Sequence, residues 1–177
     1  MSVEQDYTPL TASSASDPTP LTIKVHAYRL LTSSPLLLTA VLLVAGTFRL
    51  FGVDWDQLQH LHPDERFLTL VGTRLDLPQS LAQYIDPKSS PLNPYLLPDV
   101  SFFVYGTFPL FLTRAVGEIW GATGYDTFHL VGRYLSALFD IGTVAMVFMI
   151  GRQLFDKRVA VVGAILYGLT VLSIQIS

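Results

Sequence analysis

The chain has 177 residues, of which 50% are hydrophobic and only 14% are charged, and its mean hydropathy is +0.44. Soluble globular domains carry about 25% charged residues, so this composition predicts a membrane protein. The net charge of −3 is small and scattered, which argues against nucleic acid as a partner, and the lack of Cys excludes disulfides, thiolate metal sites and cysteine catalysis.

Residues 1–30 are rich in Ser, Thr, Pro and Asp and predict a disordered cytoplasmic tail. The first apolar run extends from Pro35 to Val53 and contains one charged residue, Arg49. At about 1.5 Å per residue such a run crosses a bilayer, so a transmembrane helix is predicted over residues 31–53. The long side chain of Arg49, near the far end, is expected to reach the lipid headgroups.

Residues 54–132 predict a long extracytoplasmic loop with helices at the membrane surface. The segment Pro63-Asp64-Glu65-Arg66 predicts a helix start, because Pro and acidic residues are favoured in a first turn. The following stretch, Leu77 to Pro98, contains five prolines and is expected to be irregular.

A further stretch, Ser101 to Trp120, is long enough to span but contains Pro109, Arg114 and Glu118. We expect it to form one or two helices lying at the membrane interface. The residues expected to form its buried face are Phe102, Phe103, Phe108, Phe111 and Trp120.

Two more apolar runs predict transmembrane helices over residues 133–151 and 159–177, joined by a cytoplasmic loop at 152–158. The basic residues of that loop place it on the same side as the N-terminus, in the cytoplasm. The predicted fold class is therefore all-α: a multi-pass protein of the inner (plasma) membrane with three transmembrane helices and interfacial helices. The last run is still apolar at Ser177, so the chain is expected to be a fragment that is inactive alone. No histidine lies inside a predicted span, which disfavours pigment binding.

The segment from His60 to Arg66 carries the main candidates for chemistry, since it places two carboxylates at the water end of a predicted span. There they stay hydrated while facing a substrate held in the lipid. As an alternative, Asp64 and Glu65 only stabilise the helix dipole, by about 0.3–1 kcal/mol.

Two further polar features have alternative interpretations. His60 and His62, with Asp54, Asp56 and Asp64 nearby, form either a divalent-metal site or a polar loop, and no cofactor is predicted. Asp140 lies inside a predicted span, where an ionisable residue is a functional candidate.

These features together resemble the N-terminal part of the GT-C membrane glycosyltransferases, the superfamily of the protein O-mannosyltransferases and the bacterial lipid A aminoarabinose transferases. The matching pieces are the end of the first helix, Phe48-Arg49-Leu50-Phe51-Gly52, the Asp-Glu pair in the first outside loop, the surface helices, and a helix that starts Arg133-Tyr134-Leu135-Ser136 and ends Gly151-Arg152-Gln153-Leu154-Phe155. The resemblance covers roughly residues 35–177.

The resemblance implies transfer of a sugar from a polyprenyl-phosphate donor to an acceptor hydroxyl or amine on the extracytoplasmic side, with inversion. Asp64 is then the catalytic base and Glu65 orients Asp64 or the sugar. Arg66 or Arg133 holds the lipid phosphate, and His62 and Asp140 are further substrate-binding candidates. Besides the lipid-linked donor and membrane lipids, a larger membrane complex is a candidate partner. The alternative function is a small non-catalytic subunit that packs in such a complex.

Overall fold

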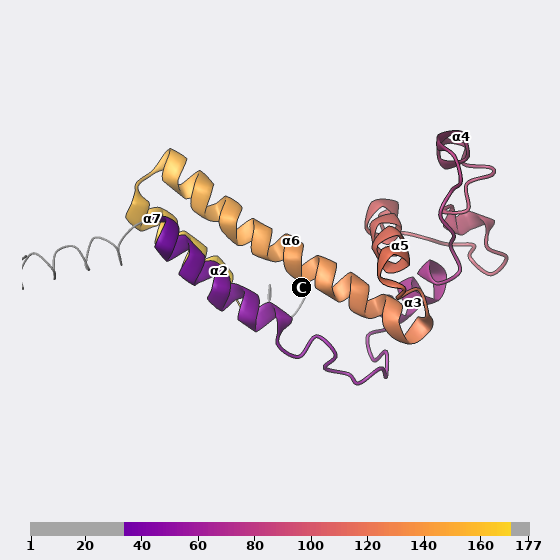
Figure 1. The fold of residues 1–177 in the computed structure, drawn as a ribbon, viewed down its shortest axis with the longest axis horizontal. Coiled ribbons are helices and arrows are strands. Elements are labelled where there is room, and N and C mark those ends of the chain that lie inside the picture. The colour runs from indigo at the N-terminus through magenta and orange to yellow at the C-terminus, as the bar shows by residue number, and fades with distance from the viewer. Residues whose placement is uncertain (1–33, 171–177) are drawn as a thin grey trace, which may run out of the picture. The chain divides into compact units, whose positions relative to one another are not determined.

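The computed structural model describes residues 34–170 (Figure 1), so the predicted tail and residues 171–177 of the last predicted span lie outside the described part. Within that part the chain forms helices and no strand, which confirms the all-α prediction. The helices are α2 (Ser34–Leu50), α3 (Pro63–Gly72), α4 (Leu81–Ile85), the 3-10 helix η1 (Pro94–Leu96), α5 (Thr107–Trp120), α6 (Tyr125–Leu154) and α7 (Lys157–Gly168). The chain divides at Leu37, and the unit considered below is Leu38–Ser177.

Helices α2, α6 and α7 pack together through small residues. Ala45 of α2, Val144 of α6 and Ala164 of α7 are buried in one apolar cluster. At Gly151 of α6 a Cβ atom would lie only 2.8 Å from the Cα of Ala160 in α7, so glycine lets the two helices approach closely. The turn between them is stabilised by Asp156, whose carboxylate accepts a hydrogen bond from the backbone N–H of Val159 as an N-cap.

Helix α6 has 30 residues and is long and apolar enough to cross a membrane. No other helix in the described part is as long: α2 has 17 residues and the described α7 has 12. The second predicted span is thus found inside a longer helix, while the three-span arrangement stays a prediction. Because α6 begins at Tyr125 rather than at residue 133, it includes His129, which lies outside the predicted span of residues 133–151.

Residues 54–124, here called the cap, lie between α2 and α6 in the chain. Helix α3 begins at Pro63 with Asp64 and Glu65 in its first turn, which confirms the predicted helix start. Its buried Val71 packs with Leu110 of α5 and Phe128 at the beginning of α6. At Gly72 a Cβ atom would lie 2.3 Å from the Phe128 ring, so α3 and α6 are in close contact there. This contact fixes α3 against the start of the long helix.

The proline-rich stretch is more regular than expected, because local side-chain caps support two short helices in it. The Ser80 side chain accepts a hydrogen bond from the N–H of Gln83 at the start of α4. Asn93 does the same for Tyr95 at the start of η1. The prediction of an irregular segment is therefore correct only for the residues between these helices.

Helix α5 forms within the stretch expected to lie at the membrane interface. Phe103 and Leu110 are buried in the cap core, whereas Phe102, Phe108 and Trp120 are exposed on the protein surface. Arg114 is also buried, where it forms ion pairs with Asp76 and Glu118. The contact of the exposed aromatic residues with the membrane interface stays a prediction.

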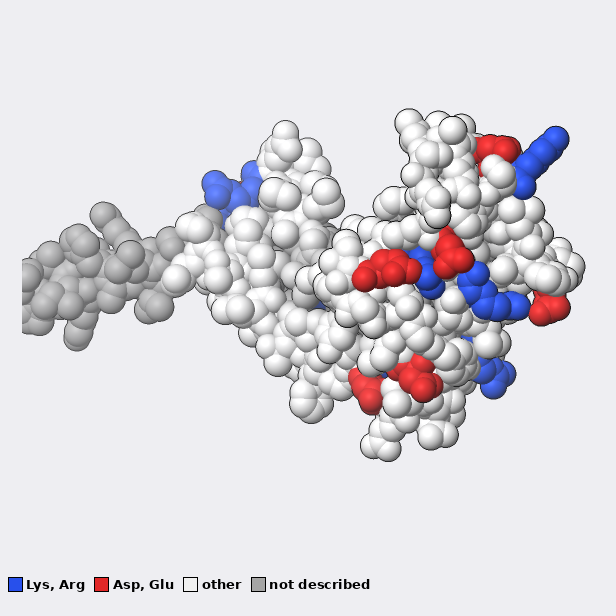
Figure 2. Space-filling view, turned by 45° about the vertical axis from the view of Figure 1, so that its right-hand side comes forward, with Lys and Arg blue, Asp and Glu red and all other residues white. Residues whose placement is uncertain are grey.

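Charged side chains are distributed unevenly over the molecule. On the face drawn in Figure 2 they gather over the cap, while the surface of the apolar helices is almost free of them apart from a basic group near their turn. Between Arg133 and Arg152, α6 has Asp140 as its only charged residue. This separation is typical of a helical membrane segment with a water-exposed cap.

Candidate functional site

The guanidinium of Arg133 is the centre of a charged cluster where α6 meets the cap. Its Nε and Nη2 atoms donate to the two carboxylate oxygens of Glu65, both at 2.6 Å. Its Nη1 and Nη2 atoms donate to the two oxygens of Asp56, both at 3.0 Å, and Nη1 also donates to the carbonyl of Val53 at 2.6 Å. A guanidinium has five N–H groups, so every donor of Arg133 is in use.

The cluster is largely removed from water. The side chains of Asp56, Arg133 and Glu65 are 0%, 11% and 23% exposed. The hydrogen bond from Arg133 lowers the pKa of Asp56 below its ordinary value, against the opposing effect of burial. Asp56 is therefore ionised at neutral pH, and two carboxylates share one guanidinium.

The loop from Asp54 to Leu61 brings Asp56 to this position with an unusual backbone. Gln57, Leu58 and His60 have positive φ values of 48°, 65° and 49°, a conformation that is uncommon for residues other than glycine. The carboxylate of Asp54 accepts a hydrogen bond from the N–H of Leu58, and that of Asp56 accepts one from the N–H of Leu61. Such strained segments persist only where surrounding contacts hold them, and they concentrate at functional sites.

The two adjacent acids of α3 have different surroundings. Glu65 is held by Arg133, whereas Asp64 is exposed at the N-terminus of the helix. A hydrogen bond to Asp64 raises the pKa of the Tyr105 hydroxyl, so the phenol and this carboxylate are in contact. Asp64 is thus an accessible carboxylate, whereas Glu65 forms an ion pair with Arg133.

The remaining candidates of the His60–Arg66 segment are only partly brought into this cluster. His62 is exposed at the N-cap of α3, and its side chain makes no capping hydrogen bond. The Arg66 side chain is exposed and has no ion pair within residues 34–170. Arg133, predicted as an alternative phosphate ligand, has no guanidinium donor left for one. Its guanidinium also lies 5.5 Å from the ring centroid of Trp55.

Asp140 belongs to a second charged group, about 10 Å further along α6 at ~1.5 Å per residue. Its carboxylate accepts hydrogen bonds from Arg49 of α2 and from the Tyr167 hydroxyl of α7, the latter at 2.6 Å. Arg49 also donates to the carbonyl of Gly168 at 2.9 Å, and its side chain is fully buried. The expectation that Arg49 extends to the headgroups is therefore wrong, because the Asp140 carboxylate of α6 binds its guanidinium within the protein. Asp140 joins three helices and is not part of the Arg133 cluster.

His129 and Tyr105 were missed by the sequence analysis, and Asp56 was considered only as a metal ligand. His129 precedes Arg133 by four residues, a spacing that places both on one face of a helix, so the longer α6 would have revealed it. No comparable sequence signal exists for Tyr105, which lies in a loop far from Asp64 in the sequence.

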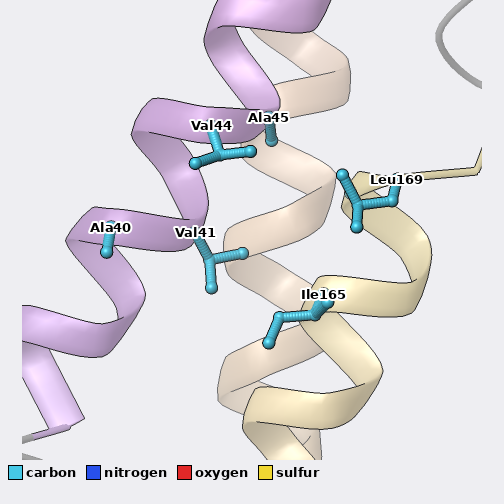
Figure 3. Close-up of a pocket in the computed structure, with 7 residues that line it drawn as sticks. Ala40, Val41, Val44, Ala45, Ile165 and Leu169 are labelled. Carbon is cyan, nitrogen blue, oxygen red and sulfur yellow. The ribbon is translucent and has the colours of Figure 1, made fainter.

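An apolar groove lies between α2 and the end of α7 (Figure 3). It has a volume of about 240 Å³ and is lined by Val41 and Val44 of α2, by Ile165 of α7 and by Leu169 just after α7, among others. Every side chain drawn in it is hydrocarbon, so it offers no group for acid–base chemistry or metal binding. The chemical capacity of the described chain is therefore concentrated where the cap meets α6.

Comparison of the chain with protein-family models, with curated proteins and with solved structures gives no match. Its function is therefore inferred from its residues and their geometry.

Proposed function

We propose that this protein is a GT-C-type membrane glycosyltransferase that moves a sugar from a polyprenyl-phosphate donor to an acceptor hydroxyl or amine. The observation that carries the proposal is the different placement of the two adjacent acids of α3. Asp64 is exposed and in contact with Tyr105, while Glu65 is held by Arg133 at the start of the membrane-length helix. A catalytic base must be both accessible and accurately positioned. Asp64 is accessible, and its fixed neighbour Glu65 holds the same helix turn in place.

In the proposed reaction Asp64 removes the proton of the acceptor as the acceptor atom attacks the anomeric carbon. The bond from that carbon to the phosphate oxygen breaks at the same time, and polyprenyl phosphate leaves with the bonding electrons. A single displacement of this kind inverts the configuration of the sugar. Glu65 and Arg133 act by holding the first turn of α3, and hence Asp64, in place.

Arg66 is the better candidate of the two arginines for the lipid phosphate, because Arg133 is saturated with hydrogen bonds. The Arg66 side chain is exposed two residues after Asp64, and arginine matches phosphate geometry with paired N–H donors. A groove of about 420 Å³ in the cap, lined by Phe67 of α3 and by Arg74 just after α3 among others, is a candidate for the acceptor. His62 and Asp140 have no defined role in this proposal.

The proposed topology places the N-terminus and residues 152–158 in the cytoplasm and the cap outside, with α2, α6 and α7 crossing the membrane. Single cysteines at Gln79 and Gln153 form a matched pair, since the chain has no Cys and both residues are exposed glutamines. A membrane-impermeant thiol reagent added to intact cells should label Gln79→Cys and leave Gln153→Cys unlabelled until the cells are lysed. Labelling of Gln153→Cys in intact cells contradicts this orientation.

Asp64→Asn in the complete gene product should reduce turnover with a polyprenyl-phosphate sugar about 10²- to 10⁴-fold, the range typical of general-base assistance. The physical reason is that an amide cannot take the acceptor proton. Glycosyl transfer would be measured with purified protein in detergent. Glu65→Gln should reduce turnover less, because a positioning group does not itself move the proton.

Asp86→Asn is the matched control, because Asp86 is an exposed cap aspartate at the end of α4 and the amide oxygen keeps one hydrogen-bond acceptor. Its turnover should equal that of the unaltered protein. If Asp64→Asn also retains full turnover, Asp64 is only a helix-start residue. A non-catalytic subunit of a larger membrane complex then becomes the better interpretation.

A further inference from the structure

A group of metal-ligating side chains overlaps the Arg133 cluster through Asp56. One ligand atom each from Asp54, Asp56 and His129 lies within 4.8 Å of the other two. Asp54 is exposed, whereas Asp56 and His129 are buried. The three residues come from two distant parts of the chain, the loop after α2 and the second turn of α6.

The histidines of this region are buried without hydrogen-bond partners. His129 and His60 are each 3% exposed, and neither ring nitrogen of either residue has a hydrogen-bond partner among residues 34–170. Their rings contact each other edge to face, with centroids 4.3 Å apart. A buried polar group without a hydrogen bond destabilises a fold, so two such imidazoles need a compensating interaction. Metal coordination is one, since imidazole is the commonest protein ligand for transition metals.

The electrostatics of the group also favour a cation. Asp54, Asp56 and Glu65 contribute three carboxylates, and Arg133 contributes one guanidinium, which leaves two net negative charges. Asp126, 4.0 Å from the His60 Nε2 atom, adds a further carboxylate at the exposed edge. A divalent ion would neutralise the two remaining charges of the inner group.

The carboxylates keep lone pairs for an ion despite their existing hydrogen bonds. The Oδ1 atom of Asp56 accepts one bond, from Arg133, and a carboxylate oxygen can accept two. Asp54 uses Oδ1 for the N–H of Leu58. Asp54 and Asp56 can therefore bind a metal ion while they keep their hydrogen bonds to Leu58 and Arg133.

We propose that Asp54, Asp56 and His129 form a binding site for a divalent transition metal of the Zn²⁺ class, with His60 turning to supply the fourth ligand. Nitrogen and oxygen ligands without thiolate suit such ions, and zinc bonds to them at about 2.0–2.2 Å. Ligand atoms of a tetrahedral site at these bond lengths are about 3.4 Å apart, so atoms that lie within 4.8 Å of one another need to approach by at most roughly 1.4 Å. Such an ion would join the strained loop to α6 beside the hydrogen bonds that hold α3. The site is inferred from this geometry and does not depend on glycosyl transfer.

The test is metal binding by the complete protein in detergent, after removal of bound metal with a chelator. Zn²⁺ would be titrated calorimetrically, and bound metal would be counted by mass spectrometry after gel filtration. Co²⁺ would serve as a spectroscopic substitute whose visible absorption reports tetrahedral coordination. We expect one equivalent of Zn²⁺ per chain and a tetrahedral Co²⁺ spectrum.

His129→Ala and Asp54→Asn should each weaken Zn²⁺ binding by about 10-fold or more, because loss of a ligand costs at least as much as loss of its supporting contacts. Asp54→Asn should not disturb folding, because Asp54 is exposed and the amide oxygen can still accept the hydrogen bond from the N–H of Leu58. Weaker Zn²⁺ binding by this variant would therefore result from loss of the ligand. His62→Ala is the control, an exposed histidine two residues from His60 and outside the group. Asp64→Asn should bind zinc normally, so failure of the metal proposal and failure of the transferase proposal are distinguishable.

Several results would overturn the site. The unaltered protein binding no Zn²⁺ above a chelator-treated blank would do so directly. Equal Zn²⁺ affinity of Asp54→Asn and the unaltered protein would also overturn the site, because it would show that the ion binds elsewhere. Loss of binding in His62→Ala, with retention in His129→Ala, would move the ligand to the exposed surface.

Discussion

Arg133→Met should lower the free energy of unfolding by about 3–5 kcal/mol, the usual loss when one partner of a buried ion pair is removed. The substitution keeps much of the side-chain length but leaves Asp56, fully buried, and Glu65, mostly buried, without their guanidinium. It also leaves the carbonyl of Val53 without its donor. Denaturant unfolding of the protein in detergent micelles, followed by circular dichroism, measures the loss.

Arg66→Met is the matched control, because Arg66 is exposed and unpaired within residues 34–170, and surface substitutions usually change stability by no more than about 0.5 kcal/mol. Arg133→Lys should give an intermediate loss, since an ammonium keeps the charge but cannot bond both carboxylates in pairs. Equal stability of Arg133→Met and Arg66→Met would mean that the cluster does not hold the cap to α6.

The effect of Arg133→Met should also depend on pH. The pKa of Asp56 in the folded protein is below its ordinary value of 3.8, so the stabilisation from this pair is present above about pH 4 and is lost as the pH falls through the lower, folded value. The difference between Arg133→Met and the unaltered protein should therefore be largest near neutral pH and shrink in acid.

Arg49→Met should cause a loss of similar size, about 3–5 kcal/mol, because it deprives the Asp140 carboxylate of its guanidinium within the apolar helices. Asp140→Leu should also destabilise, since Arg49 then loses the Asp140 carboxylate that balances its charge. The double variant Arg49→Met, Asp140→Leu should recover most of either loss, because it removes both charges and fills the space with apolar atoms. Unfolding measurements on the four proteins form a double-mutant cycle.

The cycle also tests whether Asp140 has a role beyond structure. Additive losses would show that Arg49 and Asp140 do not depend on each other for stability. If the double variant regains stability but loses glycosyl transfer, Asp140 contributes to the substrate site as well as to helix packing. Full transfer activity in the stable double variant would assign Asp140 to the joining of α2, α6 and α7.

Local sequence patterns were sufficient to predict most of the helices. The apolar runs correspond to α2, α6 and the described part of α7, and the proline followed by two acids correctly predicted the start of α3. These features depend on interactions between residues within a few turns of each other, such as backbone hydrogen bonds and the helix dipole. Element boundaries were less accurate, since α6 begins well before its apolar part because its first turns pack against the cap.

The partners of the charged residues were decided only by the tertiary structure. Arg133 binds Asp56 and Glu65, which precede it by 77 and 68 residues, and Arg49 binds Asp140 across 91 residues. Their positions relative to the predicted spans identified Asp64, Glu65 and Asp140 as candidates, and the family resemblance added Arg133. Neither argument distinguished the exposed Asp64 from Glu65, which Arg133 holds. A carboxylate in the sequence is equally compatible with catalysis, helix capping or an ion pair. Which of these it serves depends on the charges and the burial that folding brings around it, and those come from segments far away in the chain.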